Sequence, residues 1–298
     1  MKIKYYPGCA QKNSAVNFEE SSILAMQELG VELEELERWN CCGTVYSMTQ
    51  DNLMLQMGAF RNLLRVEEEG ENKLVTMCSM CYNTLKRANS FVKSSEKNMK
   101  KINDFMYKEN HQYRGTVEVL HLLELLDKEI GYPKIKSRVK NPLNGMKVGS
   151  YYGCMLVRPK EYSLDSRFED PDILERLLDT IGCKPVDFPY KLECCGAYQV
   201  VSSPDMVQNR TYKILMSARR AGCEALITSC PLCAYNLDQM QEKTQETFTD
   251  FEGLPVFYFT ELLYLALKSQ WLKNWNKYHN FDILPILREK KILGELVL

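Results

Sequence analysis

Ten cysteines of this 298-residue chain form one five-cysteine pattern that occurs twice. Each copy has a single cysteine, then a Cys-Cys-Gly triplet, then a Cys-x-x-Cys motif. The spacing is similar, with 31 and 39 residues before the Cys-Cys pair and 35 and 34 after it. Chance does not place five thiols in this way twice, so the pattern predicts two equivalent sites. The ten residues are Cys9, Cys41, Cys42, Cys78, Cys81, Cys154, Cys194, Cys195, Cys230 and Cys233.

The sequence around the cysteines repeats as well, which indicates that whole domains were duplicated. Residues 119–126 (VLHLLELL) match residues 256–263 (VFYFTELL), and a similar YYPGC or YYGC segment contains the first cysteine of each copy. The length also fits about two domains. We therefore predict an N-terminal domain at 1–140, a C-terminal domain at 146–270 and a C-terminal tail at 271–298.

Two further cysteines lie outside the repeated set. Cys183 takes the place of Val31 in the first copy, and Cys223 takes the place of Glu71. We expect Cys183 to be a small core residue and Cys223 to lie at a helix end on the surface.

Composition excludes several classes of function. Lys plus Arg (38) and Asp plus Glu (39) nearly cancel, and no basic block occurs, so nucleic-acid binding is not indicated. The most apolar stretch, residues 254–267, is shorter than the roughly 20 residues that span a membrane, so membrane insertion is not expected. The first residues carry no hydrophobic signal segment, which predicts a cytoplasmic protein whose regularly spaced thiols bind metal.

Hydrophobic periodicity predicts an α/β fold in which each duplicated domain has a mainly parallel sheet flanked by helices. Each cysteine group follows a predicted strand, and ligands gather at that edge of a parallel sheet. We expect residues 90–114 to be a peripheral helical excursion, 134–145 to be a linker, and the tail to pack on its own domain. Strands are expected at 2–6, 31–36, 73–76, 147–151, 184–188 and 225–228, and helices at 18–29, 83–89, 171–181 and 204–221.

Three kinds of cysteine site remain open at this point. A structural zinc takes four ligands, as does a cubane 4Fe-4S cluster, whereas each copy offers five thiols. The Cys-x-x-Cys motifs alone would fit thioredoxin-like dithiols, but the other cysteines would then have no role. The number of ligands favours a polynuclear iron-sulfur site. Gly43 and Gly196 would then allow a sharp turn or a close approach of the backbone to the cluster.

The double pattern of Cys, Cys-Cys-Gly and Cys-x-x-Cys resembles the tandem cysteine-rich CCG domains of heterodisulfide reductase, and the two-domain chain is similar to the catalytic B subunit of that enzyme. The resemblance covers residues 1 to 265 and matches at all ten cysteines. It implies two noncubane 4Fe-4S clusters related by pseudo-twofold symmetry. Cys9, Cys41, Cys42, Cys78 and Cys81 would bind one cluster, and the five cysteines of the second copy the other.

The resemblance also implies a substrate and partners. The two clusters would be the catalytic groups and would reduce the mixed disulfide of coenzyme M and coenzyme B to two thiols. Because the chain has no ferredoxin-type cysteine run, electrons would arrive from the iron-sulfur C subunit and the flavin-containing A subunit of the reductase, with a hydrogenase or formate dehydrogenase behind them. The alternative is an electron-transfer component of a glycolate, lactate or succinate oxidoreductase complex, because CCG domains occur there too.

An anionic substrate needs cationic contacts. Lys12 and Arg158 each lie within a few residues of the first cysteine of a copy, so they are the candidate substrate contacts. His121 lies in an apolar segment and is expected to be a core residue.

Overall fold

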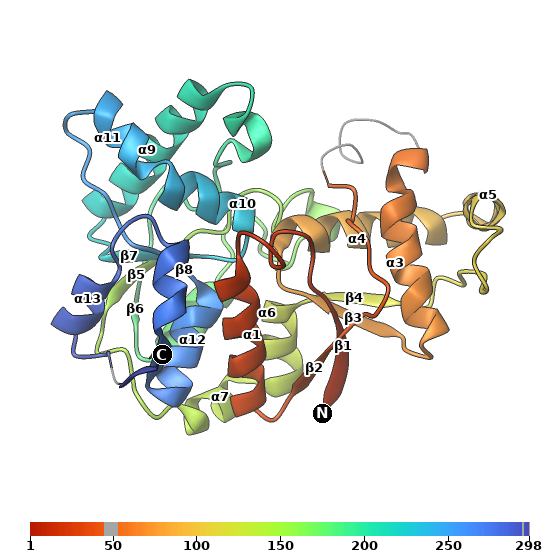
Figure 1. Cartoon of the computed structure of the whole chain (residues 1–298), viewed down its shortest axis with the longest axis horizontal. Helices are drawn as coiled ribbons and strands as arrows, with labels where there is room; N and C mark the ends of the chain where they lie inside the picture. The colour runs from red at the N-terminus through yellow and green to blue at the C-terminus, as the bar shows by residue number, and fades with distance from the viewer. Residues whose placement is uncertain (45–52, 294, 298) are drawn as a thin grey trace.

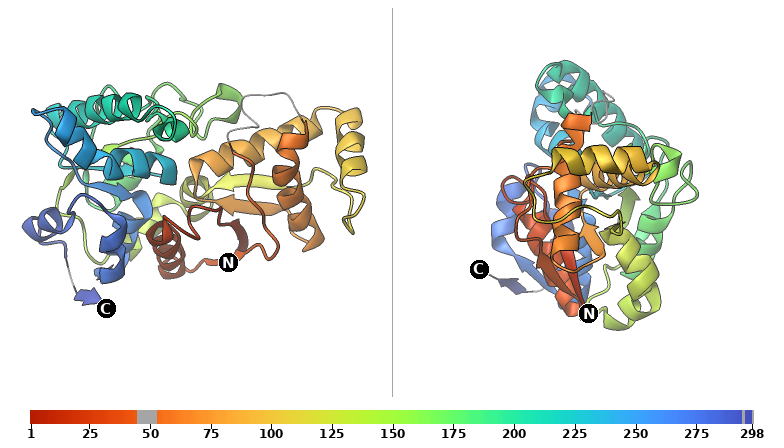
Figure 2. Two further views of the ribbon diagram at one scale, coloured as in Figure 1. Left: turned by 45° about the horizontal axis from the view of Figure 1, so that its top comes forward. Right: turned by 90° about the vertical axis from the view of Figure 1, so that its right-hand side faces the viewer.

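Two four-stranded parallel sheets, one in each half of the chain, form the framework of the protein (Figure 1). The computed structural model describes residues 1–44, 53–293 and 295–297. Helices flank both sheets, and the two halves lie side by side in Figure 1 and in the left view of Figure 2. The predicted α/β fold with duplicated parallel sheets is confirmed.

The N-terminal half has the strand order β2-β1-β3-β4. Helix α1 ends beside Gly30, whose φ of 78° fits the glycine expected after this helix. The strands are β1 (Lys2–Tyr6), β2 (Glu32–Glu35), β3 (Lys73–Thr76) and β4 (Glu118–His121). The helical elements are α1 (Val16–Glu28), η1 (Leu53–Gln56), α3 (Met57–Glu68), α4 (Ser79–Lys93), α5 (Glu96–Phe105), α6 (Leu122–Glu124), η2 (Leu125–Ile130) and α7 (Tyr132–Arg138).

The C-terminal half repeats this topology with the strand order β6-β5-β7-β8. Its strands are β5 (Lys147–Ser150), β6 (Lys184–Val186), β7 (Ala225–Thr228) and β8 (Val256–Tyr258). Its helical elements are η3 (Lys160–Tyr162), α8 (Ile173–Thr180), η4 (Ala197–Val200), α9 (Pro204–Arg220), α10 (Pro231–Ala234), η5 (Tyr235–Gln239), α11 (Gln241–Thr247) and α12 (Phe259–Lys268).

Where the two halves meet, a helix of each half packs against a helix of the other. Helix α12 of the C-terminal half packs against α1 of the N-terminal half (Figure 1). Within this contact the Asn17 amide donates a hydrogen bond of 2.9 Å to the buried Glu261 carboxylate, and Phe18 stacks on Tyr258 with ring centroids 4.1 Å apart. Aromatic stacking and a buried hydrogen bond therefore hold this side of the boundary.

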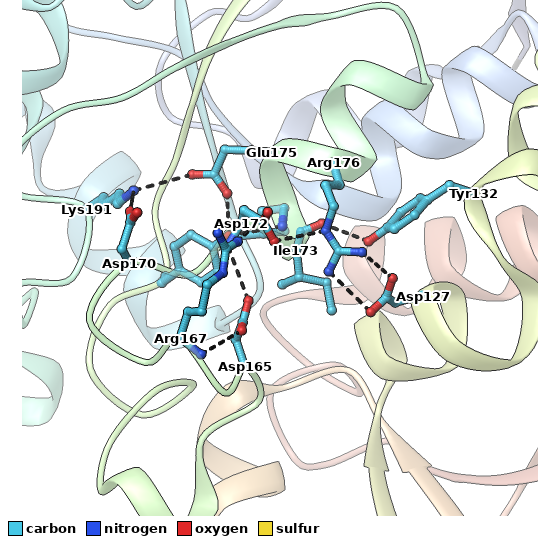
Figure 3. Close-up of polar contacts among 12 residues, drawn as sticks. Asp127, Tyr132, Asp165, Arg167, Asp170, Asp172, Ile173, Glu175, Arg176 and Lys191 are labelled. Carbon is cyan, nitrogen blue, oxygen red and sulfur yellow. Dashed lines mark hydrogen bonds and ion pairs between the residues drawn. The ribbon is translucent and has the colours of Figure 1, made fainter.

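The reciprocal contact joins η2 and α7 of the N-terminal half to α8 of the C-terminal half. There the Arg176 guanidinium pairs with both carboxylate oxygens of Asp127 at 2.6 and 3.3 Å, and Tyr132 donates to the carbonyl of Ile173 at 3.0 Å (Figure 3). The last helical segment of each half thus contacts the first long helix of the other. This reciprocity is what pseudo-twofold symmetry between duplicated domains produces.

The C-terminal tail contacts both halves, which extends the expectation that it packs on its own domain. It contains β9 (Gln270–Leu272), η6 (Lys273–Tyr278), α13 (Leu284–Glu289) and β10 (Glu295–Val297). The indole N–H of the buried Trp275 donates to Glu20 of α1 at 2.8 Å. His279 contacts the carbonyl of Val256 and the Glu261 carboxylate in the C-terminal half. The tail therefore braces the boundary between the two halves.

Several local expectations need correction. Helix α4 begins at Ser79, four residues before the predicted start, and the expected linker at 134–145 is helical as far as Arg138. Cys183 is a core residue as expected, but Cys223 is buried too, with 6% of its surface exposed. Cys223 follows α9 and directs its sulfur toward Gly149 of β5, where the missing side chain leaves room for it. Its place in the sheet core was not visible from its position at a helix end.

Candidate metal centres

Each Cys-x-x-Cys motif lies at the start of a helix that follows the third strand of its half. Cys78 and Cys230 are the N-cap residues of α4 and α10, so Cys81 and Cys233 fall within the first helical turn. The backbone N–H groups of Cys81 and Cys233 donate to the sulfurs of Cys78 and Cys230. These donors act in favour of the thiolate form at both motifs. The contact with Cys78 and burial nevertheless keep the pKa of Cys230 above its ordinary value.

A repeated tyrosine anchors each Cys-Cys-Gly loop. The Tyr6 hydroxyl donates to the carbonyl of Asn40 at 2.9 Å, and the Tyr151 hydroxyl donates to the carbonyl of Glu193 at 2.5 Å. These carbonyls belong to the residues directly before Cys41 and Cys194. The end of the first strand in each half thereby holds the Cys-Cys pair beside the Cys-x-x-Cys helix, through the last residue of β1 and the residue directly after β5. This role is not among those predicted from the sequence, although both tyrosines belong to the repeated segment.

The five thiols of each copy form a continuous chain of contacts. The Sγ atoms of Cys42 and Cys81 are 3.6 Å apart, and those of Cys195 and Cys233 are 3.5 Å apart. Thiol contacts run in the same order in both halves: Cys9, Cys41, Cys42, Cys81 and Cys78 in the first, and Cys154, Cys194, Cys195, Cys233 and Cys230 in the second. The structure therefore brings together all ten cysteines that the sequence indicated.

The two sites meet at the boundary between the halves. The thiol of Cys78 interacts with that of Cys230. Beside them the Ser79 N–H donates to the carbonyl of Ser229 at 3.2 Å, and the two serine hydroxyls are 2.7 Å apart. The Cys-x-x-Cys segments of the two copies thus touch each other rather than lying on remote faces.

A cavity of about 250 Å³ opens at the N-terminal site. All five cysteines of the first copy line it, and Pro231, Leu232 and Tyr235 at the start of the second copy's Cys-x-x-Cys helix close its other side. The cavity therefore lies between the N-terminal cysteines and the C-terminal half.

A family model described as a cysteine-rich domain, CCG, matches residues 3–86 and 148–238, one region in each half. The chain belongs to the CCG family. The matched regions contain all ten repeated cysteines.

Curated relatives of this CCG protein cover nearly its whole length. It is 33% identical over 269 residues to the 8-methylmenaquinol:fumarate reductase membrane anchor subunit of Wolinella succinogenes, covering 89% of this chain and 92% of the relative. It is 30% identical over 274 residues to the B subunit of a CoB-CoM heterodisulfide reductase of Methanosarcina acetivorans, covering 89% of each. It is 26% identical over 272 residues to a protein of Archaeoglobus profundus described as similar to the B subunit of heterodisulfide reductase, covering 89% of this chain and 91% of the relative. Relatives of this chain are thus components of multi-subunit reductases.

One solved structure shares the fold. A hypothetical protein from Helicobacter pylori superposes with a TM-score of 0.72 at 13% identity over 95% of this chain. The match covers 53% of that structure, so the CCG protein spans about half its length.

The cysteine sites fit a polynuclear cluster better than a single ion. The N-terminal cavity of about 250 Å³ is several times the roughly 30 Å³ that one water molecule occupies. Five thiols around such a space exceed the four ligands of a zinc ion. The clustered cysteines of the CCG domains therefore indicate iron-sulfur binding.

Crowding of the thiols separates their pKa values. Hydrogen bonds from Cys42 and Cys9 lower the pKa of Cys41 to about 2, and those from Cys154 and Cys195 lower the pKa of Cys194 to about 2. The hydrogen bond to Cys41, together with burial, raises the pKa of Cys9. Protons are thus shared among the thiols of each site, and metal binding must release them.

Gly43 and Gly196 have the backbone conformation that their predicted role requires. Their φ angles are 78° and 98°, in the left-handed region that favours glycine. The Gly196 N–H also lies 3.4 Å from the Cys194 sulfur and donates to it. Each glycine therefore turns the chain directly after its cysteine pair.

The two candidate substrate contacts do not line the cavity. The Lys12 ammonium pairs with Glu19 at 2.7 Å and Glu35 at 2.6 Å, so its charge is balanced within its own half. Arg158 is exposed, and its carbonyl accepts a hydrogen bond of 2.8 Å from the Asn83 amide of α4. That bond joins the loop after Cys154 to the N-terminal half. Both side chains remain predictions as substrate contacts.

His121 lies in the core next to the N-terminal site. It is fully buried, and its ring packs edge-on against Tyr82 with centroids 5.5 Å apart. Burial lowers the pKa of His121 to about 4, so the imidazole is neutral near pH 7.

Polar neighbours that sequence analysis missed distinguish the two sites. The Asn236 amide donates to the Cys195 sulfur at 3.5 Å, and the Arg210 guanidinium donates to the carbonyl of Cys194 at 2.8 Å. The aligned residues of the first copy are Thr84 and Gly58. The sequence gives one hint of this difference. The aligned residues, Asn236 with Thr84 and Arg210 with Gly58, differ in chemical type although the segments around them are similar.

In the ranges that the structure describes, no helix is both long and apolar enough to cross a membrane.

Proposed function

We propose that this protein is the disulfide-reducing component of a heterodisulfide reductase, with two noncubane 4Fe-4S clusters held by the ten repeated cysteines. The observation that carries the proposal is the contact between Cys78 and Cys230 at the boundary of the halves. It brings the two sites together beside a cavity that both halves line. A disulfide entering this cavity would meet the N-terminal site directly, and the contact between Cys78 and Cys230 would place the C-terminal site next to it.

The chemistry requires two redox groups close together. Cleaving the mixed disulfide of coenzyme M and coenzyme B takes two electrons and two protons and gives two thiols. Each cluster, when bound, exchanges one electron at a time, so two adjacent sites match the demand of one S–S bond. Electrons would come from partner proteins with iron-sulfur and flavin groups, and protons from solvent at the exposed end of the cavity.

The residues of this chain position the sites and restrict access to them. Tyr6 and Tyr151 hold the Cys-Cys loops, and the N-termini of α4 and α10 favour the thiolate ligands. The apolar side chains of Met80, Pro231 and Leu232 line the cavity and limit the water around a bound sulfur.

A second candidate function follows from the relative with 33% identity, the membrane anchor subunit of a methylmenaquinol:fumarate reductase. In that role the two adjacent sites would pass electrons between a quinol-linked partner and a flavoprotein. A relay protein needs short distances between its redox groups, which the contact of the two sites also provides.

Two measurements test these proposals. Iron and acid-labile sulfide in the anaerobically purified chain should reach the amount of two clusters, whereas a colourless protein with zinc would refute both functions. The chain should then oxidise reduced viologen dye only when the mixed disulfide is added. Dye oxidation that responds to a menaquinone analogue and not to the disulfide would favour the relay function. The Cys42→Ala variant is the matched control for either activity.

A further inference from the structure

Gln11 is a buried amide without a protein partner. Its side chain has no exposed surface, and neither its Nε2 nor its Oε1 forms a hydrogen bond within the described part of the chain. Leaving a buried polar group unpaired destabilises the folded state, because the group has given up its hydrogen bonds to water. A group outside the polypeptide, bound in contact with this amide, would satisfy it.

The position of Gln11 indicates where that group lies. Gln11 lines the same cavity as the five N-terminal cysteines. Its Oε1 lies 3.1 Å, and the Cys81 sulfur 3.2 Å, from the point that a Cβ atom on Gly8 would occupy. Because the oxygen and nitrogen of an amide can exchange places by a flip, the N–H end is equally able to face the sulfurs of the site.

We propose that the Gln11 side chain donates an N–H hydrogen bond to an inorganic sulfide of the N-terminal iron-sulfur site, on the side of the cavity where Cys81 lies. This inference rests on the proposed function only in assuming that the site holds such a cluster. A donor stabilises the more negative, reduced state, so Gln11 raises the reduction potential of the N-terminal cluster.

The duplication provides a comparison for this role. Leu156 occupies the same place in the second copy, two residues after the first cysteine, and it is fully buried. In the second site a side-chain amide comes from a different position, since Asn236 donates to the Cys195 sulfur. The residue aligned with Asn236 in the first copy is Thr84, and its hydroxyl contacts Thr44 instead. Among the described residues, the proposed donor Gln11 and the observed donor Asn236 thus come from different elements and lie near different cysteines.

The test is a redox titration of the complete, iron-loaded chain, followed by electron paramagnetic resonance. Gln11→Leu copies Leu156 with little change of volume and should lower one midpoint potential while the iron content stays the same. Asn236→Thr copies Thr84 and should lower the other. Gln11→His, which retains a donor, should keep the first potential closer to the original. If Gln11→Leu loses iron, Gln11→Met provides a second apolar side chain of similar length.

Four outcomes are distinguishable. A lowered potential in Gln11→Leu at full iron content supports the proposal. Unchanged potentials at full iron content overturn it, and so does a change confined to the KM for the disulfide, which would make Gln11 a substrate contact. A wild-type chain without iron and sulfide refutes the proposed function itself, so the two failures are distinguishable.

Discussion

The two cysteine sites use the same five ligand positions but differ in access. Cys9 and Cys41 are exposed at the N-terminal site, whereas the corresponding Cys154 and Cys194 are partly covered. The remaining three cysteines are buried at both sites. Duplication has thus preserved the interior of each site, where strands and helix starts fix the cysteines. The loops around the outer cysteines have diverged.

The helix behind each Cys-Cys pair shows how this divergence occurred. In the C-terminal half, Arg210 of α9 reaches the carbonyl of Cys194 and pairs with Glu193 at 2.7 Å. In the N-terminal half, Gly58 of α3 takes its place, and a Cβ atom there would lie 2.5 Å from the carbonyl oxygen of Cys41. A cationic side chain therefore reaches the carbonyl of Cys194, whereas the carbonyl of Cys41 packs directly on a helix backbone.

The largest expected effect tests whether the sites are separate. We expect about half of the iron to be lost from each of two variants, Cys42→Ala and Cys195→Ala, because each leaves one site with a full set of thiol ligands. Disulfide reduction should be abolished in both, because one remaining cluster cannot supply both electrons. Iron analysis and the viologen assay measure the two losses. Cys183→Ala is the matched control, since Cys183 is buried away from both sites and should retain all the iron.

The outcome that would contradict separate sites is complete loss of iron from either variant. Because Cys78 interacts with Cys230, that result would indicate that the ten thiols act as a single ligand set.

Metal removal should show the difference in access directly. With a chelator under anaerobic conditions, we expect two phases of iron loss, the faster one from the N-terminal site with its exposed Cys9 and Cys41. Absorbance of the clusters over time measures the phases. The fast phase should be absent from Cys42→Ala and present in Cys195→Ala, and the reverse assignment would show that exposure of the outer cysteines does not control access.

The Cys41 carbonyl lies so close to Gly58 that a glycine-to-alanine replacement there should lower the stability of the fold rather than raise it. The expected effect is smaller than the preceding ones. Replacing glycine by alanine within a helix normally stabilises a protein by about 0.5–1 kcal/mol. Here the new Cβ would collide with the Cys41 carbonyl, so Gly58→Ala should instead destabilise the chain by about 1–3 kcal/mol and weaken iron binding at the N-terminal site. Denaturant unfolding of the iron-loaded protein measures the first effect, and a stabilised variant would refute the contact.

The sequence predicted the features that depend on local pattern. Strands β1, β3 and β7 have the expected bounds, because short apolar runs between turn residues define them. The cysteines assembled as expected, since all follow strand ends at one edge of a parallel sheet. The features that could not be predicted depend on contacts between residues that are far apart in the sequence. The unpaired amide of Gln11, the bond from Arg210 to Cys194 and the burial of Cys223 against Gly149 all require the packed structure.

The smallest expected effect concerns the contact between the tail residue His279 and Glu261, which among the described residues has no counterpart in the N-terminal half. Glu124 and Glu261 are aligned in the two copies, but Glu124 pairs with the exposed Lys128 at 3.0 Å. Glu261 is fully buried and meets the His279 ring of the tail at 3.0 Å. Burial would lower the pKa of His279, but the Glu261 and Asp238 carboxylates facing it outweigh burial and raise that pKa above its ordinary value.

The sign of the pH dependence follows from this shift. A histidine whose folded-state pKa is raised stabilises the fold fully below its unfolded pKa of about 6.5, and this stabilisation is lost as the pH rises through the folded value. The free energy of unfolding should therefore fall from about pH 6.5 upward in the wild-type chain, and His279→Asn should remove that part of the slope. Lys128→Gln in the N-terminal half is the matched control, because it alters an exposed pair and should leave the slope in place. Equal slopes in His279→Asn and the wild type would mean that the tail does not brace Glu261, and the two halves would then be alike in this respect.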